Sequence, residues 1–197
     1  MESKLKSRVD SQALYIIVGG ANDYLSANVA EIESSQIENA IANLRLSLIR
    51  LVNAGAKNII IGNLPNLGLL PSTRGDAEVL QKLTSITKTH NQILANTVED
   101  IRQYFGRDIN IKIFDLYSLF ESVNHNPQKF GFSNITQGCL IVQCDNPDQF
   151  LFWDEIHPTA KGHQIMSDFA LQLLEPSISQ KTKNPAKNLY HQRKKTN

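Results

Sequence analysis

Three short apolar runs, separated by long stretches of helical periodicity, restrict the fold of this sequence more than any other feature. ALYIIVGG (13–20) ends in a glycine pair, the second run (58–61) leads into a loop with Pro and Gly, and INIKIFDL (109–116) is the third. The first two runs predict buried strands, and the third predicts a further strand. Because these strands alternate with helices, the sequence predicts an α/β fold, with a mostly parallel sheet and helices on both faces.

Apolar side chains recur every three or four residues between these strands, which predicts amphipathic helices. Ser34 or Ser35 can cap the first helix, and Gly55 suits its end. Pro158 stands at the start of the last helix, where its missing N–H group costs little. The predicted helices lie within residues 34–56, 76–105, 115–123 and 159–174.

The remaining segments carry weaker patterns. Residues 124–149 are rich in Asn, Pro, Gly and Gln, which predicts a long loop before the apolar stretch FLFW (150–153). Residues 1–176 are expected to form one domain. Residues 177–197 have six basic side chains and no acidic one, which predicts a disordered tail. A contact of this tail with nucleic acid or anionic lipid is the alternative interpretation.

Charge and composition limit the partners that this chain is expected to have. The formal net charge of +1 gives no strong field for nucleic acid or an anionic membrane, so we expect no nucleic-acid partner. No stretch approaches the roughly 20 apolar residues of a transmembrane segment. The first twelve residues are polar and hold no apolar signal core. Cys139 and Cys144 could pair in an oxidising compartment or remain two thiols on a loop.

FWDEIHPTAKGH (152–163) contains an Asp and a His three residues apart, immediately before a predicted helix. In the catalytic interpretation, Asp154 orients His157, and the imidazole takes a proton from a nucleophile. In the structural interpretation, Asp154 only accepts hydrogen bonds from backbone N–H groups of a surface turn. A metal site with His163 as a further ligand is disfavoured, because a catalytic zinc normally has three well-placed protein ligands.

GGAND (19–23) follows the first predicted strand, and it too has several interpretations. A tight turn is the simplest, because Gly and Asn tolerate positive φ. A phosphate-binding loop is disfavoured by the glycine spacing and by the lack of a following Lys-Ser/Thr. In the catalytic interpretation, the amide of Asn22 stabilises a developing oxyanion. Sites in such sheets form outside the carboxyl ends of the strands, so Asn22 and His157 are expected to converge.

These residues carry a resemblance to a known family. GAND (20–23) resembles the G-x-N-D block of the GDSL or SGNH hydrolases, and DEIHP (154–158) resembles their D-x-x-H-P block. HNQIL (90–94) and NIIIGNLPNLGLLP also resemble family segments, and FLFWDEIHPTAKGH is similar to the plant and cyanobacterial branch. The resemblance covers about residues 11–174. A C-x4-C pair before the last block is similar to this branch too, which implies a disulfide between Cys139 and Cys144.

The resemblance implies an esterase or lipase with a three-layer, flavodoxin-like α/β/α fold and no cofactor. Carried over by position, Asn22 is an oxyanion-hole donor, His157 is the general base and acid, and Asp154 orients it. The reaction would be acyl transfer to a serine followed by hydrolysis. The substrate would be a small-molecule or lipid ester, such as a lipid acyl or acetyl group. Many relatives would be exported, so the compartment is left open.

Two family blocks have no counterpart in the sequence: the G-D-S-L block with the nucleophile and the block with the oxyanion glycine. The only Gly-Asp pair, Gly75-Asp76, opens a helix, and Ser7 and Ser11 precede the first strand on the wrong side. In the family's strand order, 2-1-3-4-5, the sheet would be incomplete at its N-terminal side, and strand 13–20 would become an open apolar edge. We therefore expect a fragment whose serine belongs to an upstream segment, a missing N-terminal half.

Two alternatives remain for a chain with this sequence. One is a non-catalytic remnant of the same fold that serves as an interaction module. The other is an active enzyme with an unorthodox nucleophile.

Overall fold

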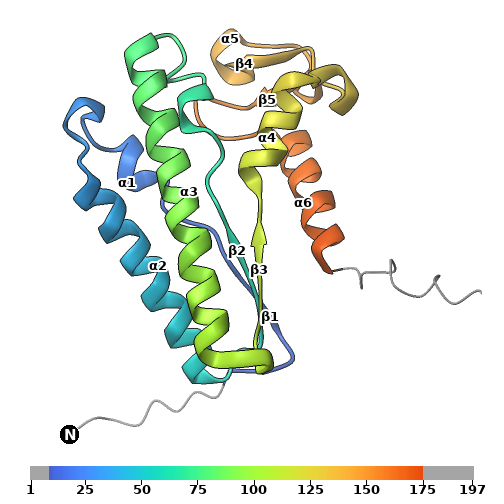
Figure 1. Ribbon diagram of the computed structural model, residues 1–197. Coiled ribbons are helices and arrows are strands. Elements are labelled where there is room, and N and C mark those ends of the chain that lie inside the picture. Colours follow the sequence, from blue (N-terminus) through green and yellow to red (C-terminus); the bar gives the residue numbers. More distant parts are fainter. Residues whose placement is uncertain (1–8, 175–197) are drawn as a thin grey trace, which may run out of the picture.

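A computed structural model describes residues 9–174 of the protein; the basic segment 177–197 lies outside the described residues. The main sheet contains β1 (Leu14–Ile17), β2 (Asn58–Gly62) and β3 (Asn110–Phe114). All three strands are parallel and lie in the order β1-β2-β3 (Figure 1). The three predicted strands are thus confirmed: β1 and β3 are shorter than the segments 13–20 and 109–116, whereas β2 extends one residue beyond 58–61. The expectation of a buried strand is wrong for β1, whose residues alternate between exposed and partly buried.

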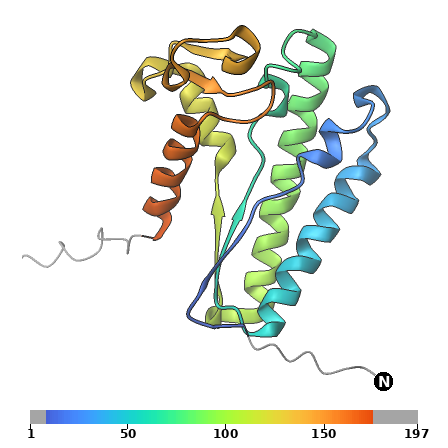
Figure 2. The ribbon, with the colours of Figure 1, turned by 180° about the vertical axis from the view of Figure 1, so that it is seen from behind.

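Helices cover both faces of this sheet, as the α/β prediction requires. The long helices α2 (Ser34–Ala54) and α3 (Ala77–Phe105) pack side by side on one face, and α6 (Ala160–Leu174) lies on the other (Figures 1 and 2). Successive β2 residues point to opposite layers: Ile59 and Ile61 belong to the larger core, whereas Ile60 packs in the cluster that contacts α6. The short helices α1 (Asn22–Leu25) and α4 (Leu116–His125) follow β1 and β3 directly.

The start of α2 differs from the prediction that Ser34 or Ser35 caps it. The N-cap residue is Glu33, which forms a capping box with Gln36: each side chain accepts a hydrogen bond from the other residue's backbone N–H. The serines therefore lie inside the first helical turn. At the other end, Gly55 adopts φ of 109°, the left-handed conformation expected of a C-terminal glycine.

The prediction of an irregular loop over 124–149 is wrong in part. This region contains β4 (Asn134–Gly138) and the one-turn helix α5 (Cys139–Val142), and β4 pairs in parallel with β5 (Phe150–Phe152) in a second, two-stranded sheet. β4 has the sequence NITQG, which lacks both a continuous apolar run and clean alternation. Only its partner β5 reveals it as a strand, so the local sequence could not predict it.

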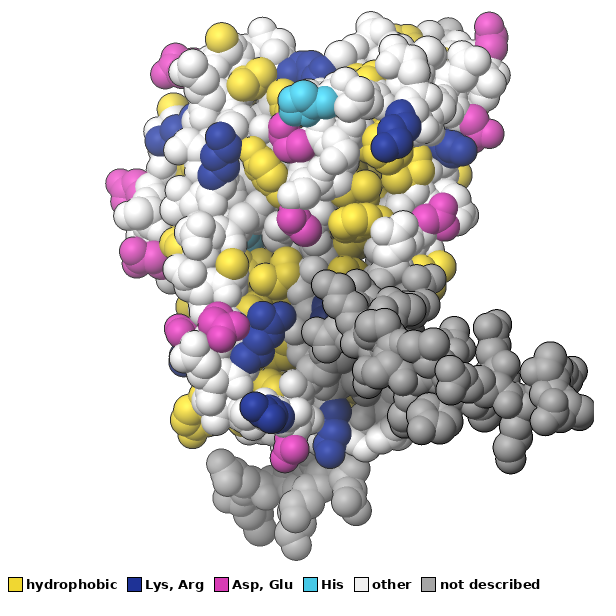
Figure 3. Space-filling view, turned by 45° about the vertical axis from the view of Figure 1, so that its right-hand side comes forward, with side chains coloured by type: hydrophobic (Ala, Val, Ile, Leu, Met, Phe, Trp, Pro, Cys, Tyr) yellow, Lys and Arg dark blue, Asp and Glu magenta, His cyan; other side chains and the backbone are white. Residues whose placement is uncertain are grey.

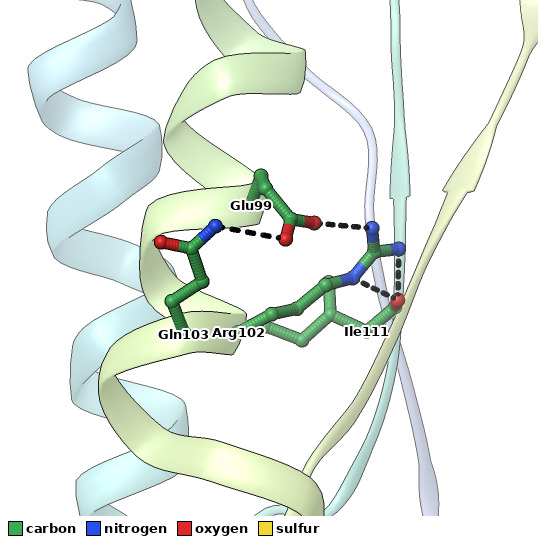
Figure 4. A network of polar contacts seen from close by, with 4 residues as sticks. All are labelled: Glu99, Arg102, Gln103 and Ile111. Atoms are coloured by element: carbon green, nitrogen blue, oxygen red, sulfur yellow. Dashed lines mark hydrogen bonds and ion pairs between the residues drawn. The ribbon is translucent and has the colours of Figure 1, made fainter.

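The C-terminal part of α3 is attached to β3 by a polar cluster. The Arg102 guanidinium donates two hydrogen bonds to the Ile111 carbonyl, at 3.1 Å from Nε and 2.5 Å from Nη2, and pairs with Glu99 at 3.4 Å (Figure 4). Gln103 donates to the same Glu99 carboxylate. The carbonyl contacts fix the last turns of α3 against the strand, whereas the exposed ion pair itself adds little stability.

Strand β1 lies at the edge of the sheet and pairs, within residues 9–174, with β2 alone. Ile16 is in register with Ile60, so the side chains of Leu14, Ile16 and Val18 point to the face that α6 covers. Yet α6 does not cover these three, since Ile16 and Val18 are each 59% exposed. In the view that brings α6 forward, hydrophobic side chains lie open between charges of both signs (Figure 3). Among the described residues, the sheet therefore has an apolar edge at β1 that no further strand or helix covers.

Candidate active site

Asp154 and His157 lie in the turn between β5 and α6 and contact each other directly. The imidazole Nδ1 is 2.8 Å from Asp154 Oδ2, while Oδ1 accepts hydrogen bonds from the backbone N–H groups of Ile156 and His157 at 2.8 and 2.7 Å. One carboxylate oxygen thus shapes the turn, and the other holds the ring. The structural and catalytic interpretations of this motif are both compatible with the geometry, because the two oxygens serve different partners.

The ionisation of Asp154 follows from these contacts. Burial by itself would raise the pKa of the carboxyl group, but the hydrogen bonds from His157 and Ile156 and the charge of the imidazole together hold this pKa below its ordinary value. An ionised carboxylate can only accept, so we assign the proton of the neutral ring to Nδ1. Nε2 of His157 then carries a free lone pair on a side chain that is 70% exposed. A nitrogen in this state can act as a general base.

Neighbouring segments fix the turn at both ends. Trp153 N–H donates to the His157 carbonyl at 2.8 Å, and Thr159 Oγ1 accepts from Gly162 N–H in the first turn of α6. The Ser72 N–H donates to the Glu155 carbonyl at 3.1 Å, which ties the turn to the loop before α3. The imidazole is therefore presented by a backbone that is held from several sides.

The β4–α5 segment packs against the same turn more tightly than any side chain would permit. A Cβ atom placed on Gly138 would lie 2.4 Å from the Asp154 carbonyl oxygen, so this position requires glycine. Two residues after Gly138, the Leu140 N–H group donates a hydrogen bond to the Trp153 carbonyl at 2.8 Å. Cys139 and Cys144 form a disulfide with Cα atoms 5.0 Å apart, which closes the α5 loop beside the turn.

Asn22 is the first residue of α1, at the carboxyl end of β1. Its side chain is exposed and makes no hydrogen bond within residues 9–174, so its amide is free to donate to a ligand. The preceding Gly20 has φ of 110°, and a Cβ there would lie 3.0 Å from the ring of His90. The segment between β1 and α1, which holds Gly20, and the β5–α6 loop lie at the same end of the molecule (Figures 1 and 2). No hydrogen bond joins Asn22 to the β5–α6 loop in the described residues.

His90 and Tyr24 form a buried pair beneath the Asn22 turn. His90 begins the family-like segment HNQIL, but the sequence does not indicate its contact with Tyr24. Both side chains are 0% exposed, and the Tyr24 hydroxyl lies 2.8 Å from His90 Nδ1, in a hydrogen bond between α1 and α3. Burial, with a smaller contribution from Asp23, raises the pKa of Tyr24 to about 12. The second ring nitrogen of His90, Nε2, has no partner within residues 9–174. His90 stands seven residues after Leu83 and four before Leu94 on the buried face, which is the periodicity that could have revealed it.

We predict that acid destabilises the fold through His90. Burial lowers the pKa of this imidazole from 6.5 to about 4, so the unfolded chain binds a proton between these values and the folded chain does not. The stabilisation is complete above pH 6.5 and is lost as pH falls toward 4. The free energy of unfolding in urea should therefore fall by about 3 kcal/mol from pH 7 to pH 4 on account of His90 alone.

The matched variant His90→Gln separates this effect from the titration of carboxylates such as Asp154 and Asp115, which are common to both proteins. The variant should be less stable at pH 7 but lose less stability on acidification. Equal pH dependence in the two proteins would show that His90 is not the titrating group.

Within residues 9–174, no group of three or more His, Cys, Asp and Glu side chains is arranged to hold a metal ion, and His163 lies exposed on α6. No helix of this part of the chain is long and apolar enough to cross a membrane.

Comparison with known proteins identifies the family. A model of the GDSL-like Lipase/Acylhydrolase family matches residues 2–170, most of the chain. The chain belongs to this family. The GDSL resemblance noted in the GAND and DEIHP blocks is thereby confirmed, and the parallel, helix-covered sheet agrees with a flavodoxin-like fold.

Individual GDSL relatives are distant but similar over most of this chain. A GDSL esterase/lipase of Arabidopsis thaliana is 27% identical over 87% of the chain, and the thermolabile hemolysin of Vibrio parahaemolyticus is 26% identical over 85%. The phosphatidylcholine-sterol acyltransferase of Aeromonas hydrophila is 26% identical over 82%. The chain spans 56%, 42% and 61% of the lengths of these three proteins, about half of each. At the level of the family, the GDSL chain is related to ester hydrolases and acyltransferases.

Proposed function

We propose that this protein contributes the base and the oxyanion donor of a serine esterase or lipase, and that it acts on lipid or other small carboxylic esters. The observation that carries the proposal is the Asp154–His157 pair, in which Nδ1 contacts the carboxylate and Nε2 has no hydrogen-bond partner within residues 9–174. This arrangement suits a general base that must take a proton from a nucleophile and return it to a leaving group.

In the proposed reaction, a serine oxygen attacks the ester carbonyl carbon while its proton passes to His157 Nε2. The tetrahedral intermediate carries a negative oxygen, to which the Asn22 amide donates a hydrogen bond. The intermediate collapses, the alcohol leaves with the proton from Nε2, and an acyl-serine remains. Water then attacks this ester with the same proton relay, releasing the acid and restoring serine. Asp154 stays ionised throughout and stabilises the imidazolium ion.

The names of relatives support a lipid ester as the substrate class. They include an esterase/lipase and a phosphatidylcholine-sterol acyltransferase, and the second differs from a hydrolase only in the acceptor of the acyl group. Replacing water by a sterol hydroxyl in the second step changes the product but not the roles of His157, Asp154 and Asn22.

The serine itself is proposed to come from a segment other than residues 1–197, the missing N-terminal half. Within residues 9–174, no hydroxyl group hydrogen-bonds to the His157 imidazole, whose one partner there is Asp154. The open edge of β1 and the exposed face of Leu14, Ile16 and Val18 would accept a further strand and a covering helix. A parallel strand added there would end beside Gly20 and Asn22, where a nucleophile is needed.

The test compares two forms of the protein: residues 1–197 alone, and the same residues preceded by the segment encoded immediately upstream. The longer form should hydrolyse p-nitrophenyl acetate and react covalently with a fluorophosphonate at a serine outside residues 1–197. Labelling of a serine within residues 1–197 would refute the external nucleophile. If neither form hydrolyses the ester, the proposed function is wrong, and a non-catalytic interaction module becomes the better account of this fold.

A further inference from the structure

Two adjacent segments beside His157 expose an unusual number of large apolar side chains. We call this set the α5 patch: Leu140, Ile141, Val142, Trp153 and Ile156. Their side chains are between 38% and 57% exposed. The first three lie in α5 with Cys139, and the other two lie on either side of Asp154 in the sequence. The hydrogen bond from Leu140 N–H to the Trp153 carbonyl places the two segments side by side.

The backbone around the α5 patch keeps these side chains from turning inward. The Cys139–Cys144 disulfide closes the loop that carries α5, and Gly138 packs directly on the Asp154 backbone. Gln143 adopts φ of 50°, a left-handed conformation that ends α5 and is uncommon for a residue other than glycine. Because these side chains are held in water, their exposure costs free energy. Apolar patches of this kind commonly mark binding surfaces.

The charges in the segment between Lys129 and Lys161, which carries the α5 patch, indicate which surface it fits. Between Phe130 and Ala160 the chain has four carboxylates, Asp145, Asp148, Asp154 and Glu155, and neither Lys nor Arg. An anionic bilayer would be repelled, since attraction to such membranes requires basic side chains near the surface. A single exposed Trp beside aliphatic side chains is instead suited to the boundary between lipid headgroups and acyl chains.

We propose that the α5 patch docks the protein on a zwitterionic phospholipid surface, such as a phosphatidylcholine bilayer. The inference rests on the proposed function, whose ester substrate it narrows to lipid presented at an interface. Trp153 immediately precedes Asp154 and Ile156 immediately precedes His157, so their insertion would bring the catalytic turn to the level of the ester groups. The His157 imidazole would then meet its substrate without extraction of a whole lipid into water.

Trp153 provides the measurement, because it is the only tryptophan of the protein. Its fluorescence emission should shift to shorter wavelength when residues 1–197 are titrated with vesicles of pure phosphatidylcholine, and the protein should float with these vesicles. Vesicles of pure phosphatidylglycerol should produce a weaker shift. No shift with phosphatidylcholine, or binding only to phosphatidylglycerol, would overturn the proposal.

Variants locate the binding surface. Ile141→Asp should weaken partition into phosphatidylcholine about tenfold or more, because an inserted apolar side chain is replaced by a charge. Two matched controls replace exposed apolar residues elsewhere: Leu46→Ser on α2 and Ile16→Ser on the open face of β1. Both should bind vesicles like the unchanged protein. Loss of binding in Ile16→Ser, with binding retained in Ile141→Asp, would place the lipid surface on β1 and refute the α5 patch.

Self-association is the competing use of an apolar patch, and light scattering without lipid detects it. If Ile141→Asp converts a dimer to a monomer and leaves vesicle binding unchanged, the α5 patch is an interface between copies and the proposal fails. None of these measurements needs ester hydrolysis. The lipid inference can therefore fail while p-nitrophenyl acetate, a substrate that dissolves in water, is still hydrolysed. Conversely, residues 1–197 can bind phosphatidylcholine vesicles even if no form of the protein hydrolyses the ester.

Discussion

Replacing His157 with alanine should lower kcat for p-nitrophenyl acetate by about three to six orders of magnitude in the ester-hydrolysing form of the protein. The loss is large because one imidazole both removes the proton from the nucleophile and returns it to the leaving group. KM should change little, since the exposed ring contributes no binding pocket of its own. Steady-state kinetics with circular dichroism on the same samples will separate a catalytic loss from a folding defect.

The matched control for His157 is His163→Ala, which removes another exposed histidine six residues further along, on α6. It should retain nearly full activity. A loss of less than tenfold in His157→Ala, or equal losses in both variants, would contradict the assignment of His157 as the general base.

The second large effect is expected at Asn22. Replacing it with alanine should reduce kcat about 10² to 10³-fold, or about 2.7–4 kcal/mol of transition-state stabilisation, because a donor to the oxyanion is lost. Stability to urea should hardly change, because the side chain is exposed and has no hydrogen-bond partner within residues 9–174. Asn22→Asp should be at least as damaging, since its carboxylate would repel the developing charge.

Asn43→Ala, on the exposed side of α2, is the control for the loss of an asparagine in a helix. It should leave kcat unchanged. Unchanged kcat in Asn22→Ala as well would mean that the oxyanion is stabilised by other groups, and the role of Asn22 would have to be abandoned.

The parts of the site that were predictable from sequence are those made by residues near one another in the chain. The contact between Asp154 and His157 closes within one turn, and the requirement for a turn before α6 is visible in Pro158 and the helical periodicity after it. The three strands were likewise visible: β1 and β2 lie in continuous apolar runs, and in β3 the apolar residues Ile111, Ile113 and Phe114 are interrupted only by Lys112. Glycine in the left-handed conformation at residue 55 follows from the same local rules.

What could not be predicted depends on partners far away in the sequence. Tyr24 meets His90 across 66 residues, and nothing near either residue indicates the other. Gly138 reads as an ordinary loop glycine until the Asp154 backbone is seen against it. The strand β4 is polar, and it exists because β5 offers it hydrogen bonds. In each case, contacts with a distant segment determine the local structure. These contacts outweigh the weak propensity of the residues themselves.

The edge of β1 that has no partner strand within residues 9–174 also determines how a sample of residues 1–197 must be handled. Backbone groups that can accept a foreign strand can equally accept β1 of another copy, and the apolar side chains beside them favour that contact. Growth by such pairing depends steeply on concentration, so a dilute sample and a concentrated one can hold different species. Shelf life, turbidity and apparent molecular mass should therefore be followed across a dilution series before any kinetic constant from residues 1–197 is interpreted.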